Sequence, residues 1–260
     1  MPALQGVGVL VTRPEQQAMP LCRLLEIQGA STLRLPAVEI KPIGNRRETA
    51  AQLGALAEFD VIIFTSANAV RFGASLLDQQ RDLTLAAIGP ATARALNHAG
   101  YRVAVLPPGG TFDSESLLRH PRLEHPAGRR MLIIKGSNGR PFLEDELASR
   151  GAEVAAVDVY QRVPATPSQA VLSALLESFV GGAVQVITAT SLEIAGNLLG
   201  MATPALRDEF ERVHWLVPGE RIAAGLRERG LSAPLLQAES AEDHDLVAAL
   251  VRWRSSVSGA

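Results

Sequence analysis

The chain has 260 residues, of which 47% are hydrophobic and 20% are charged, and its formal net charge at pH 7 is −2. This composition is typical of a globular protein with one large domain or two ordinary ones, and it excludes a disordered chain. The near-neutral charge, without a basic stripe interleaved with aromatic residues, excludes a typical nucleic-acid-binding surface.

Short apolar segments alternate with amphipathic segments along the chain. We predict strands at 7–12, 60–65, 85–88, 102–106, 131–134, 153–160, 184–189 and 214–217. We predict helices at 14–28, 46–58, 67–78, 90–99, 140–150, 166–180, 192–200 and 220–229. Alternation of this kind predicts an α/β fold whose parallel sheets are covered by helices on both faces.

An internal repeat suggests two equivalent subdomains. Residues 10–30 align without a gap to residues 132–152, so that Arg13 matches Lys135. Further matches follow in the same order: Thr65-Ser66 with Thr190-Ser191, Gly89 with Gly219, and 113–118 with 243–248. Any two strand–helix units share a rhythm of leucine and glycine, but ordered matches over most of the chain favour a duplication.

Two extended stretches separate the halves of this repeat. Residues 35–44 and 157–167 are rich in β-branched residues and flanked by proline, which is typical of edge strands and linkers. We predict that they pair as a two-stranded connector.

The motifs of cofactor-dependent and metal-dependent enzymes are missing from the sequence. Gly6 and Gly8 lie before and at the start of the first predicted strand rather than after it, so they do not form a dinucleotide fingerprint. Residues 135–140 lack the spacing of a phosphate loop, which argues against a nucleotide-dependent transferase. The five histidines have no metal-ligand spacing, and no nucleophile elbow occurs. We therefore expect neither a cofactor nor a metal.

Small, hydroxylated and cationic residues follow the predicted strands. Ligands of open parallel sheets bind at the carboxyl ends of the strands, and backbone N–H groups at helix N-termini attract anions. The residues at these ends are Thr12-Arg13, Thr65-Ser66-Ala67-Asn68, Gly89-Pro90-Ala91-Thr92, Lys135-Gly136-Ser137-Asn138, Thr190-Ser191 and Pro218-Gly219-Glu220-Arg221. Each hydroxyl or amide is also suited to capping a helix. Together, the six ends favour an acidic ligand in a cleft between two lobes.

With these motifs the chain resembles the uroporphyrinogen-III synthase family. The resemblance rests on VTRP (11–14), FTSANAV (64–70), IGPATARAL (88–96), SESLL (114–118), RGAEVAAVDVYQR (150–162) and ITATSLEIAGNLL (187–199). It implies two similar open parallel-sheet, flavodoxin-like lobes joined by a two-stranded β connector. The first lobe would contain residues 1–37 and 163–260, and the second residues 40–160.

The resemblance also implies a reaction. A member of this family cyclises hydroxymethylbilane, a linear tetrapyrrole with eight carboxylates, to uroporphyrinogen III. Water is lost, the last pyrrole ring (ring D) is inverted, and no cofactor is used. The pyrrole nitrogen expels the hydroxyl, so the protein needs to grip carboxylates and impose a conformation rather than supply a strong nucleophile.

Tyr160 matches the tyrosine of the family's cleft, and we predict that it assists departure of the hydroxyl. A tyrosine that merely packs at the lobe junction is the alternative. The predicted substrate-binding residues are Arg13, Thr65, Ser66, Asn68, Gly89, Thr92, Lys135, Gly136, Ser137, Thr190, Ser191, Gly219 and Arg221. Arg13 and Lys135 are alternatively surface cations near helix starts. The second half of the chain departs from the family pattern, because Ile222, or Arg221 after a shift by one, stands in the place that Thr92 has in the first half.

A non-catalytic two-lobed protein that binds an anionic metabolite, or a regulator that senses one, is the alternative function, and steady turnover would distinguish an enzyme from it. The N-terminal residues lack a signal-peptide pattern, and no apolar run approaches the ~18 residues of a membrane helix. Cys22, the single cysteine, excludes internal disulfides. We expect a cytoplasmic monomer that binds a small molecule, with neither a nucleic-acid nor a membrane partner.

Overall fold

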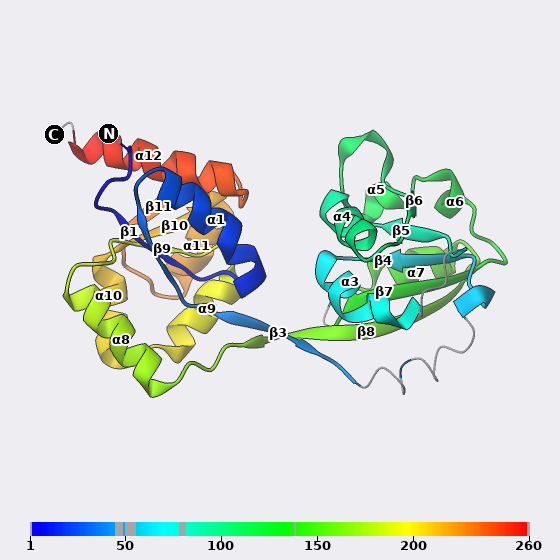
Figure 1. Cartoon of the computed structure of the whole chain (residues 1–260), viewed down its shortest axis with the longest axis horizontal. Coiled ribbons are helices and arrows are strands. Elements are labelled where there is room, and N and C mark those ends of the chain that lie inside the picture. The colour runs from blue at the N-terminus through cyan, green and yellow to red at the C-terminus, as the bar shows by residue number, and fades with distance from the viewer. Residues whose placement is uncertain (1, 45–48, 50–55, 78–81, 138, 259–260) are drawn as a thin grey trace. The chain divides into compact units, whose positions relative to one another are not determined.

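The computed structural model describes residues 2–44, 49, 56–77, 82–137 and 139–258. The chain divides into two compact units (Figure 1). Unit 1 is Met1–Glu39 with Val163–Ala260, and unit 2 is Ile40–Arg162. Each unit has its own sheet, and the two are described separately below.

Unit 1 is built on a five-stranded parallel sheet. Its strands, in the order in which they lie side by side, are β11 (Leu235–Ala238), β10 (His214–Pro218), β9 (Val186–Thr188), β1 (Gly8–Val11) and β2 (Ser31–Arg34). Its helices are α1 (Glu15–Ile27), α8 (Gln169–Val180), α9 (Leu192–Met201), α10 (Pro204–Arg212), α11 (Gly219–Glu228) and α12 (Asp243–Ser258).

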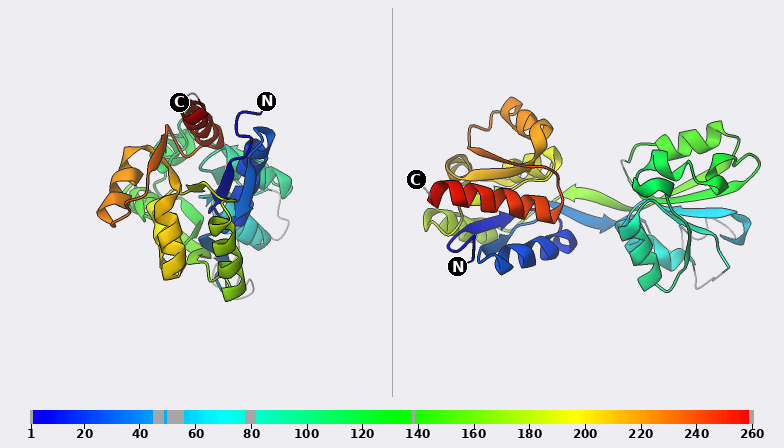
Figure 2. Two further views of the ribbon diagram at one scale, coloured as in Figure 1. Left: turned by 90° about the vertical axis from the view of Figure 1, so that its left-hand side faces the viewer. Right: turned by 90° about the horizontal axis from the view of Figure 1, so that it is seen from above.

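Apolar side chains on both faces of this sheet form the core of unit 1. Helices α1 and α12 lie side by side over one face (Figure 2), where Leu25 and Leu250 pack into one cluster with Val9. On the other face Trp215 meets the ring of Phe210 from α10 edge-on, with 6.1 Å between ring centroids. Burial on both faces explains why the central strands read as continuous apolar runs.

Unit 2 is built on a six-stranded sheet. Its strands lie in the order β3 (Val38–Pro42), β8 (Glu153–Pro164), β7 (Arg130–Gly136), β4 (Val61–Phe64), β5 (Leu85–Ala87) and β6 (Val103–Val105). All neighbours from β8 to β6 are parallel. The helices and short 3-10 turns are η1 (Leu56–Glu58), α3 (Ala67–Gly73), η2 (Ala74–Leu77), α4 (Pro90–His98), η3 (Pro108–Gly110), α5 (Ser114–Leu117), α6 (Pro121–Glu124) and α7 (Phe142–Ser149).

The core of unit 2 also has two layers. On one face Ile62 and Phe64 of β4 pack with Leu96 of α4 in a single cluster. On the other face Ile133 of β7 packs with Leu147 of α7. These helices fix the carboxyl ends of β4 and β7, where the candidate site lies.

Strands β3 and β8 are neighbours in the sheet. The Ile43 N–H donates to the Val159 carbonyl at 3.1 Å, and the Ala165 N–H donates to the Ala37 carbonyl at 3.2 Å. The residue numbers fall on one strand as they rise on the other, so the pair is antiparallel. The chain passes between the units within these strands, at Glu39/Ile40 and at Arg162/Val163.

The two sheets share one strand order. When β4, β5 and β6 are matched with β9, β10 and β11, and β7 and β8 with β1 and β2, the parallel strands of both sheets follow the same sequence of neighbours. The internal repeat predicts this pairing, because 10–30 lie on β1 and α1 while 132–152 lie on β7 and α7.

The prediction of an α/β fold with parallel sheets is confirmed, and all eight predicted strands are present. Strands β2 and β11 and helices α10 and α12 were not predicted. Strand β2 is largely exposed, so it lacks the apolar run on which the other predictions depended. Residues 46–48 and 50–55 of the predicted helix 46–58 lie outside the described residues, and 56–58 form the turn η1.

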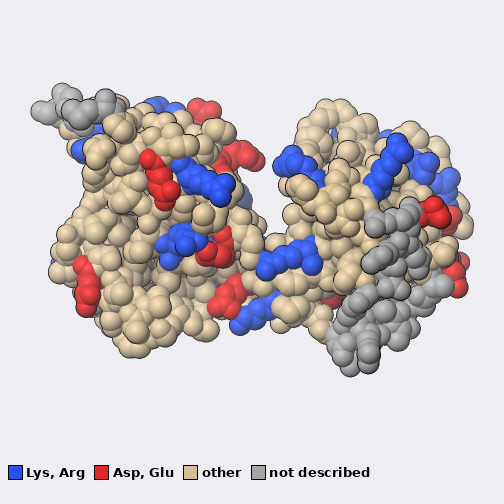
Figure 3. All heavy atoms as spheres, in the orientation of Figure 1, with Lys and Arg blue, Asp and Glu red and all other residues tan. Residues whose placement is uncertain are grey.

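Charged side chains are scattered over the surface. On the face drawn in Figure 3, acidic and basic residues lie among uncharged ones in both units, and the described residues of that face form no continuous basic stripe. None of the helices in the described part of the chain is long and apolar enough to cross a membrane.

Candidate functional site

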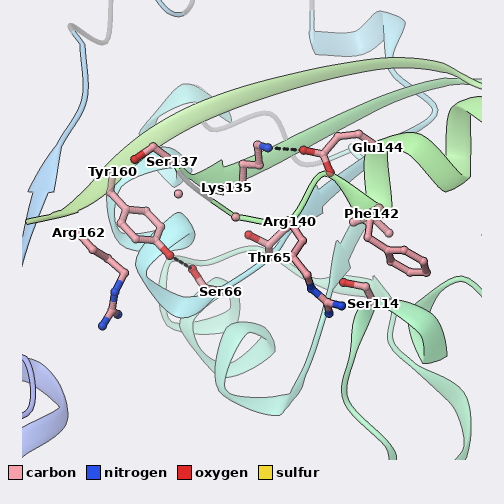
Figure 4. A pocket seen from close by; sticks show the side chains of 13 residues that line it. Thr65, Ser66, Ser114, Lys135, Ser137, Arg140, Phe142, Glu144, Tyr160 and Arg162 are labelled. Carbon is pink, nitrogen blue, oxygen red and sulfur yellow. Dashed lines mark hydrogen bonds and ion pairs between the residues drawn. The ribbon is translucent and has the colours of Figure 1, made fainter. Parts of the chain in front are cut away.

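A pocket of about 270 Å³ lies at the carboxyl ends of β4 and β7 in unit 2 (Figure 4). Its described lining residues are Thr65, Ser66, Ser114, Lys135, Gly136, Ser137, Gly139, Arg140, Phe142, Leu143, Glu144, Tyr160 and Arg162. Asn138, which was grouped with this strand end in the sequence, lies outside the described residues. The pocket is therefore where the general rule for open parallel sheets places a ligand.

Ser66 forms the junction between β4 and α3. Every residue of β4 is buried, and the chain turns directly from Phe64 through Thr65 into the helix. The Ser66 hydroxyl caps α3 by accepting a hydrogen bond from the Ala69 N–H at 3.0 Å. This cap fixes the serine side chain at the edge of the pocket, because it ties the oxygen to the first turn of the helix.

The Tyr160 ring lies between groups from three elements. Its hydroxyl is 3.1 Å from the Ser66 hydroxyl, and its ring stacks on Phe72 of α3 with centroids 6.0 Å apart. A register shift at Lys135/Gly136 places Gly136 opposite Tyr160. A Cβ on Gly136 would come within 2.7 and 2.8 Å of the two Cε atoms of the ring, so only glycine fits beneath the tyrosine.

Lys135 is already paired within the pocket. Its Nζ forms an ion pair with Glu144 of α7, and the two side chains are only 19% and 16% exposed. Arg140 is different, because its side chain is 77% exposed and its guanidinium lies 3.7 Å from Glu115. Figure 4 shows Arg140 extending toward Ser114.

Six of the predicted site residues come together in this pocket. They are Thr65, Ser66, Lys135, Gly136, Ser137 and Tyr160. The prediction that these strand ends meet came from the alternation of strands and helices, and the structure brings them to one place.

Three other predicted residues of unit 2 do not line the pocket: Asn68, Gly89 and Thr92. Thr92 is 3% exposed inside the first turn of α4, and its repeat counterpart Ile222 is also 3% exposed. Because an isoleucine occupies the equivalent position, burial in the core rather than ligand binding accounts for the residue at this position.

The predicted residues of unit 1 lie at the strand ends of its own sheet. Ser191 caps α9 by accepting from the Ile194 N–H at 3.2 Å, and Thr190 precedes it. Gly219 begins α11 with a φ of +67°, and Arg221 is exposed.

Arg13, in contrast, is buried in unit 1. Its guanidinium pairs with Asp243 and donates to the Ala241 carbonyl. The two repeat-related cations, Arg13 and Lys135, therefore each neutralise a carboxylate of this chain. Neither matches the alternative of a surface cation.

The sequence interpretation missed several pocket residues. Ser114 and Arg162 lie inside the quoted motifs SESLL and RGAEVAAVDVYQR, so their motifs were noticed but their side chains were not assigned. Phe142 and Glu144 come from the start of α7, and Arg140 comes from the segment before it. These residues could have been predicted from the sequence, because a helix that follows a parallel strand begins at the same edge of the sheet where that strand ends.

The lining can bind an anion and donate protons. It combines hydroxyls, three cationic side chains and one carboxylate. Just outside it, Asp113 caps α5, and the hydrogen bond from Ser116 holds the pKa of its carboxyl below the ordinary value. Among the described residues no group of His, Cys, Asp and Glu could hold a metal ion.

Comparisons with known proteins identify relatives along nearly the whole chain. The family model described as "Uroporphyrinogen-III synthase HemD" matches residues 20–248. The chain is 33% identical over 255 residues to uroporphyrinogen-III synthase of Escherichia coli (strain K12), an alignment that covers 94% of this chain and 100% of that protein.

Solved structures of proteins named as uroporphyrinogen-III synthases or synthetases are also similar to the chain. A mutant uroporphyrinogen III synthase from the extremely thermophilic bacterium Thermus thermophilus is 25% identical with a TM-score of 0.55, and the match covers 98% of this chain and 100% of that one. The uroporphyrinogen-III synthetase of Helicobacter pylori 26695 has a TM-score of 0.60 at 15% identity, covering 95% of this chain and 99% of that one. The second similarity supports the fold alone.

Proposed function

The chain belongs to the uroporphyrinogen-III synthase family, and we propose that it performs this family's cyclisation through the pocket of unit 2. The reaction converts hydroxymethylbilane to uroporphyrinogen III with loss of water and inversion of ring D. The observation that carries the proposal is the Tyr160 phenol, held in a pocket lined by hydroxyls and cations.

The pocket receives the reacting end of the substrate. A linear tetrapyrrole is far larger than a pocket of about 270 Å³, so one terminal ring and its carboxylates enter while the rest of the chain lies outside. Arg140 and Arg162 are placed to meet carboxylates, since a guanidinium matches a carboxylate with two parallel hydrogen bonds. Ser114, near Arg140, and Thr65 add hydroxyls to the same lining.

Tyr160 assists the departure of the hydroxyl. The terminal pyrrole nitrogen supplies the electron pair that breaks the C–O bond, and the phenol donates its proton to the leaving oxygen, which departs as water. Ring closure later releases a proton from a pyrrole carbon, and this proton restores the phenol. The balance is one water lost and no net change in the protein, so the reaction needs no cofactor.

Positioning supplies the rest of the catalysis. Loss of the hydroxyl leaves a cationic tetrapyrrole. Without an enzyme, this cation closes without inversion of ring D. A protein that holds the substrate carboxylates at several points can favour the inverted closure, because fixed geometry replaces the entropy cost of the correct approach. The strand-end residues of unit 1, including Thr190, Ser191, Gly219 and Arg221, are proposed to contribute further contacts to the substrate.

The proposal has a finer structural part. The units are proposed to be related flavodoxin-like lobes joined by a two-stranded β connector made of β3 and β8, which their shared strand order and the β3–β8 hydrogen bonds support. The reaction is intramolecular, so one copy of the chain is enough, and a cytoplasmic monomer is proposed. Sedimentation equilibrium of the purified protein tests the monomer.

The test of function is an isomer analysis. Purified protein is incubated with freshly made hydroxymethylbilane, the products are oxidised, and the porphyrin isomers are separated. We expect predominantly type III isomer. Type I isomer alone, at the spontaneous rate and from folded protein, would contradict the proposal and favour a non-catalytic binding protein.

A further inference from the structure

The hydroxyl of Ser66 belongs to a chain of hydrogen bonds that ends at the phenol of Tyr160. The Ala69 N–H donates to Ser66 Oγ at 3.0 Å, and Ser66 Oγ lies 3.1 Å from Tyr160 Oη. Both side chains are half-buried in the pocket. Ser66 is a predicted substrate-binding residue, and its hydrogen bonds join it to the start of α3 and to the tyrosine.

The number of protons on these oxygens restricts how they bond. A serine hydroxyl has one proton and two lone pairs, and a phenol has one proton as well. The Ala69 N–H already occupies one lone pair of Ser66. Either Tyr160 donates to the second lone pair, which occupies its only proton, or Ser66 donates to Tyr160 and leaves the phenolic proton available.

We propose that Ser66 is a positioning residue that donates its hydroxyl proton to Tyr160 Oη during the reaction. This inference rests on the proposed function, since it concerns the same site. The donated hydrogen bond orients the phenolic proton away from Ser66 and toward the substrate. It strengthens as Tyr160 releases its proton, because hydrogen bonds to an ionised oxygen are the stronger ones.

The Ala69 N–H reinforces this arrangement. An N–H that donates to Ser66 Oγ polarises the hydroxyl and makes it a better donor to the next oxygen along the chain. Phe72 stacks on the tyrosine ring and Gly136 lies close against it, which limits how far the phenol oxygen can move from Ser66. The rotamer of Tyr160 and the direction of its proton are thereby both fixed.

Removal of the Ser66 hydroxyl tests the proposal. We expect Ser66→Ala to lower the single-turnover rate of type III formation about fivefold to tenfold with little change in KM, as loss of one net hydrogen bond predicts. In the Tyr160→Phe background the same substitution should cause no further loss, because the group on which it acts is gone. An equal loss in both backgrounds, or an unchanged rate in the first, would overturn the proposal.

The control separates helix capping from positioning. Ser168 caps α8 in the same way, accepting from the Val171 N–H at 3.4 Å, and it does not line the pocket. We expect Ser168→Ala to lower the free energy of unfolding as a lost cap does while the rate of type III formation stays at the wild-type value. A matching fall in that rate would reduce the role of Ser66 to capping.

A spectroscopic measurement reads the hydrogen bond directly. The chain has two tyrosines, so protein labelled with ¹³C at tyrosine Cζ gives two signals, which Tyr101→Phe assigns. We expect Ser66→Ala to shift the Tyr160 signal and Ser168→Ala to leave it in place; an unshifted signal in Ser66→Ala would contradict the proposal. If the wild-type protein forms type III isomer but these tests fail, only the role of Ser66 is refuted. If the wild-type protein forms no type III isomer, the proposed function is refuted as well.

Discussion

Tyr160 has little freedom to move, because its ring lies close against the backbone of Gly136. The phenyl ring lies over Gly136, with Phe72 stacked against it. The register shift between β7 and β8 brings Gly136 opposite the tyrosine. A strand glycine of this kind marks a close approach of another group to the backbone.

Gly136→Ala should displace the tyrosine. The added methyl would lie 2.7 Å from one ring carbon, so the ring has to move, and we expect kcat for type III formation to fall roughly tenfold or more. Gly196→Ala in α9 is the control, since a Cβ there meets nothing within 4 Å. It should keep the rate and raise the free energy of unfolding by about 0.5–1 kcal/mol. Equal rates for both variants would contradict this account.

The pairing of Lys135 with Glu144 limits how much charge the pocket offers to an anion. Cations at strand ends could be predicted from the sequence, but their partners could not. Glu144 belongs to a different element from Lys135, and only the packing of α7 against β7 brings the two together. The same holds for Arg13, whose partner Asp243 lies 230 residues away.

Glu144→Gln removes the internal competitor for Lys135. We expect KM for hydroxymethylbilane to fall about twofold to fivefold at low ionic strength, and the difference to shrink as salt is added. Glu146→Gln is the matched control, because Glu146 lies on the same helix and pairs with Arg150 at 2.8 Å outside the pocket lining. A KM that falls equally in both variants would show that only the overall charge matters.

At the scale of elements, the alternation of apolar strands and amphipathic helices was sufficient to predict the central strands of both sheets. It failed for β2, which is exposed. It also failed for α12 near the C-terminus, which packs against α1 near the N-terminus. Local patterns report burial within one segment, so they cannot reveal which distant element covers it. A local pattern shows where a strand ends, so the strand-end residues could be proposed as a binding site. It does not show which helix lies beside that strand end, so the pocket residues that come from helices were missed.

The ion pair of Arg13 with Asp243 ties the end of β1 to the start of α12. The two side chains are 10% and 22% exposed, so Asp243→Asn leaves a largely buried guanidinium without its counter-charge. We expect the free energy of unfolding of unit 1 to fall by about 1–3 kcal/mol in urea titrations. Glu15→Gln breaks a comparable pair with Arg34, but those side chains are 53% and 42% exposed, so the loss should be under about 0.5 kcal/mol. Similar losses would argue against a structural role for Arg13.

At the scale of the whole molecule, one arrangement of strands occurs twice. Unit 2 is continuous in sequence, whereas unit 1 begins with β1 and β2 and is completed by β9, β10 and β11. The order of neighbours is nevertheless the same in both sheets. Each unit also contains a histidine whose environment disfavours its charged form.

These two histidines predict how stability depends on pH. Burial lowers the pKa of His214 in unit 1 and of His120 in unit 2 below 6.5, and Arg122 lowers the pKa of His120 further. The unfolded chain therefore binds protons at a higher pH than the folded one, so this stability is complete above pH 6.5 and is lost as the pH falls toward the folded pKa values. We expect the melting temperature to fall as the pH is lowered from about 7.5 to about 5.5.

The double variant His214→Gln, His120→Asn is the control for this pH dependence. Asparagine can replace His120 as the cap of α6. We expect the double variant to lose less of its melting temperature over the same pH range. An identical pH dependence in both proteins would show that other groups are responsible.

The most direct test of the central claim is the single-turnover rate of type III formation by Tyr160→Phe, compared with Tyr101→Phe as a matched loss of one phenolic hydroxyl. The account predicts at least about a tenfold loss for Tyr160→Phe, and a wild-type rate for Tyr101→Phe. A folded Tyr160→Phe protein that forms type III isomer at the wild-type rate would contradict it, and the pocket of unit 2 would then bind substrate without a role for its tyrosine.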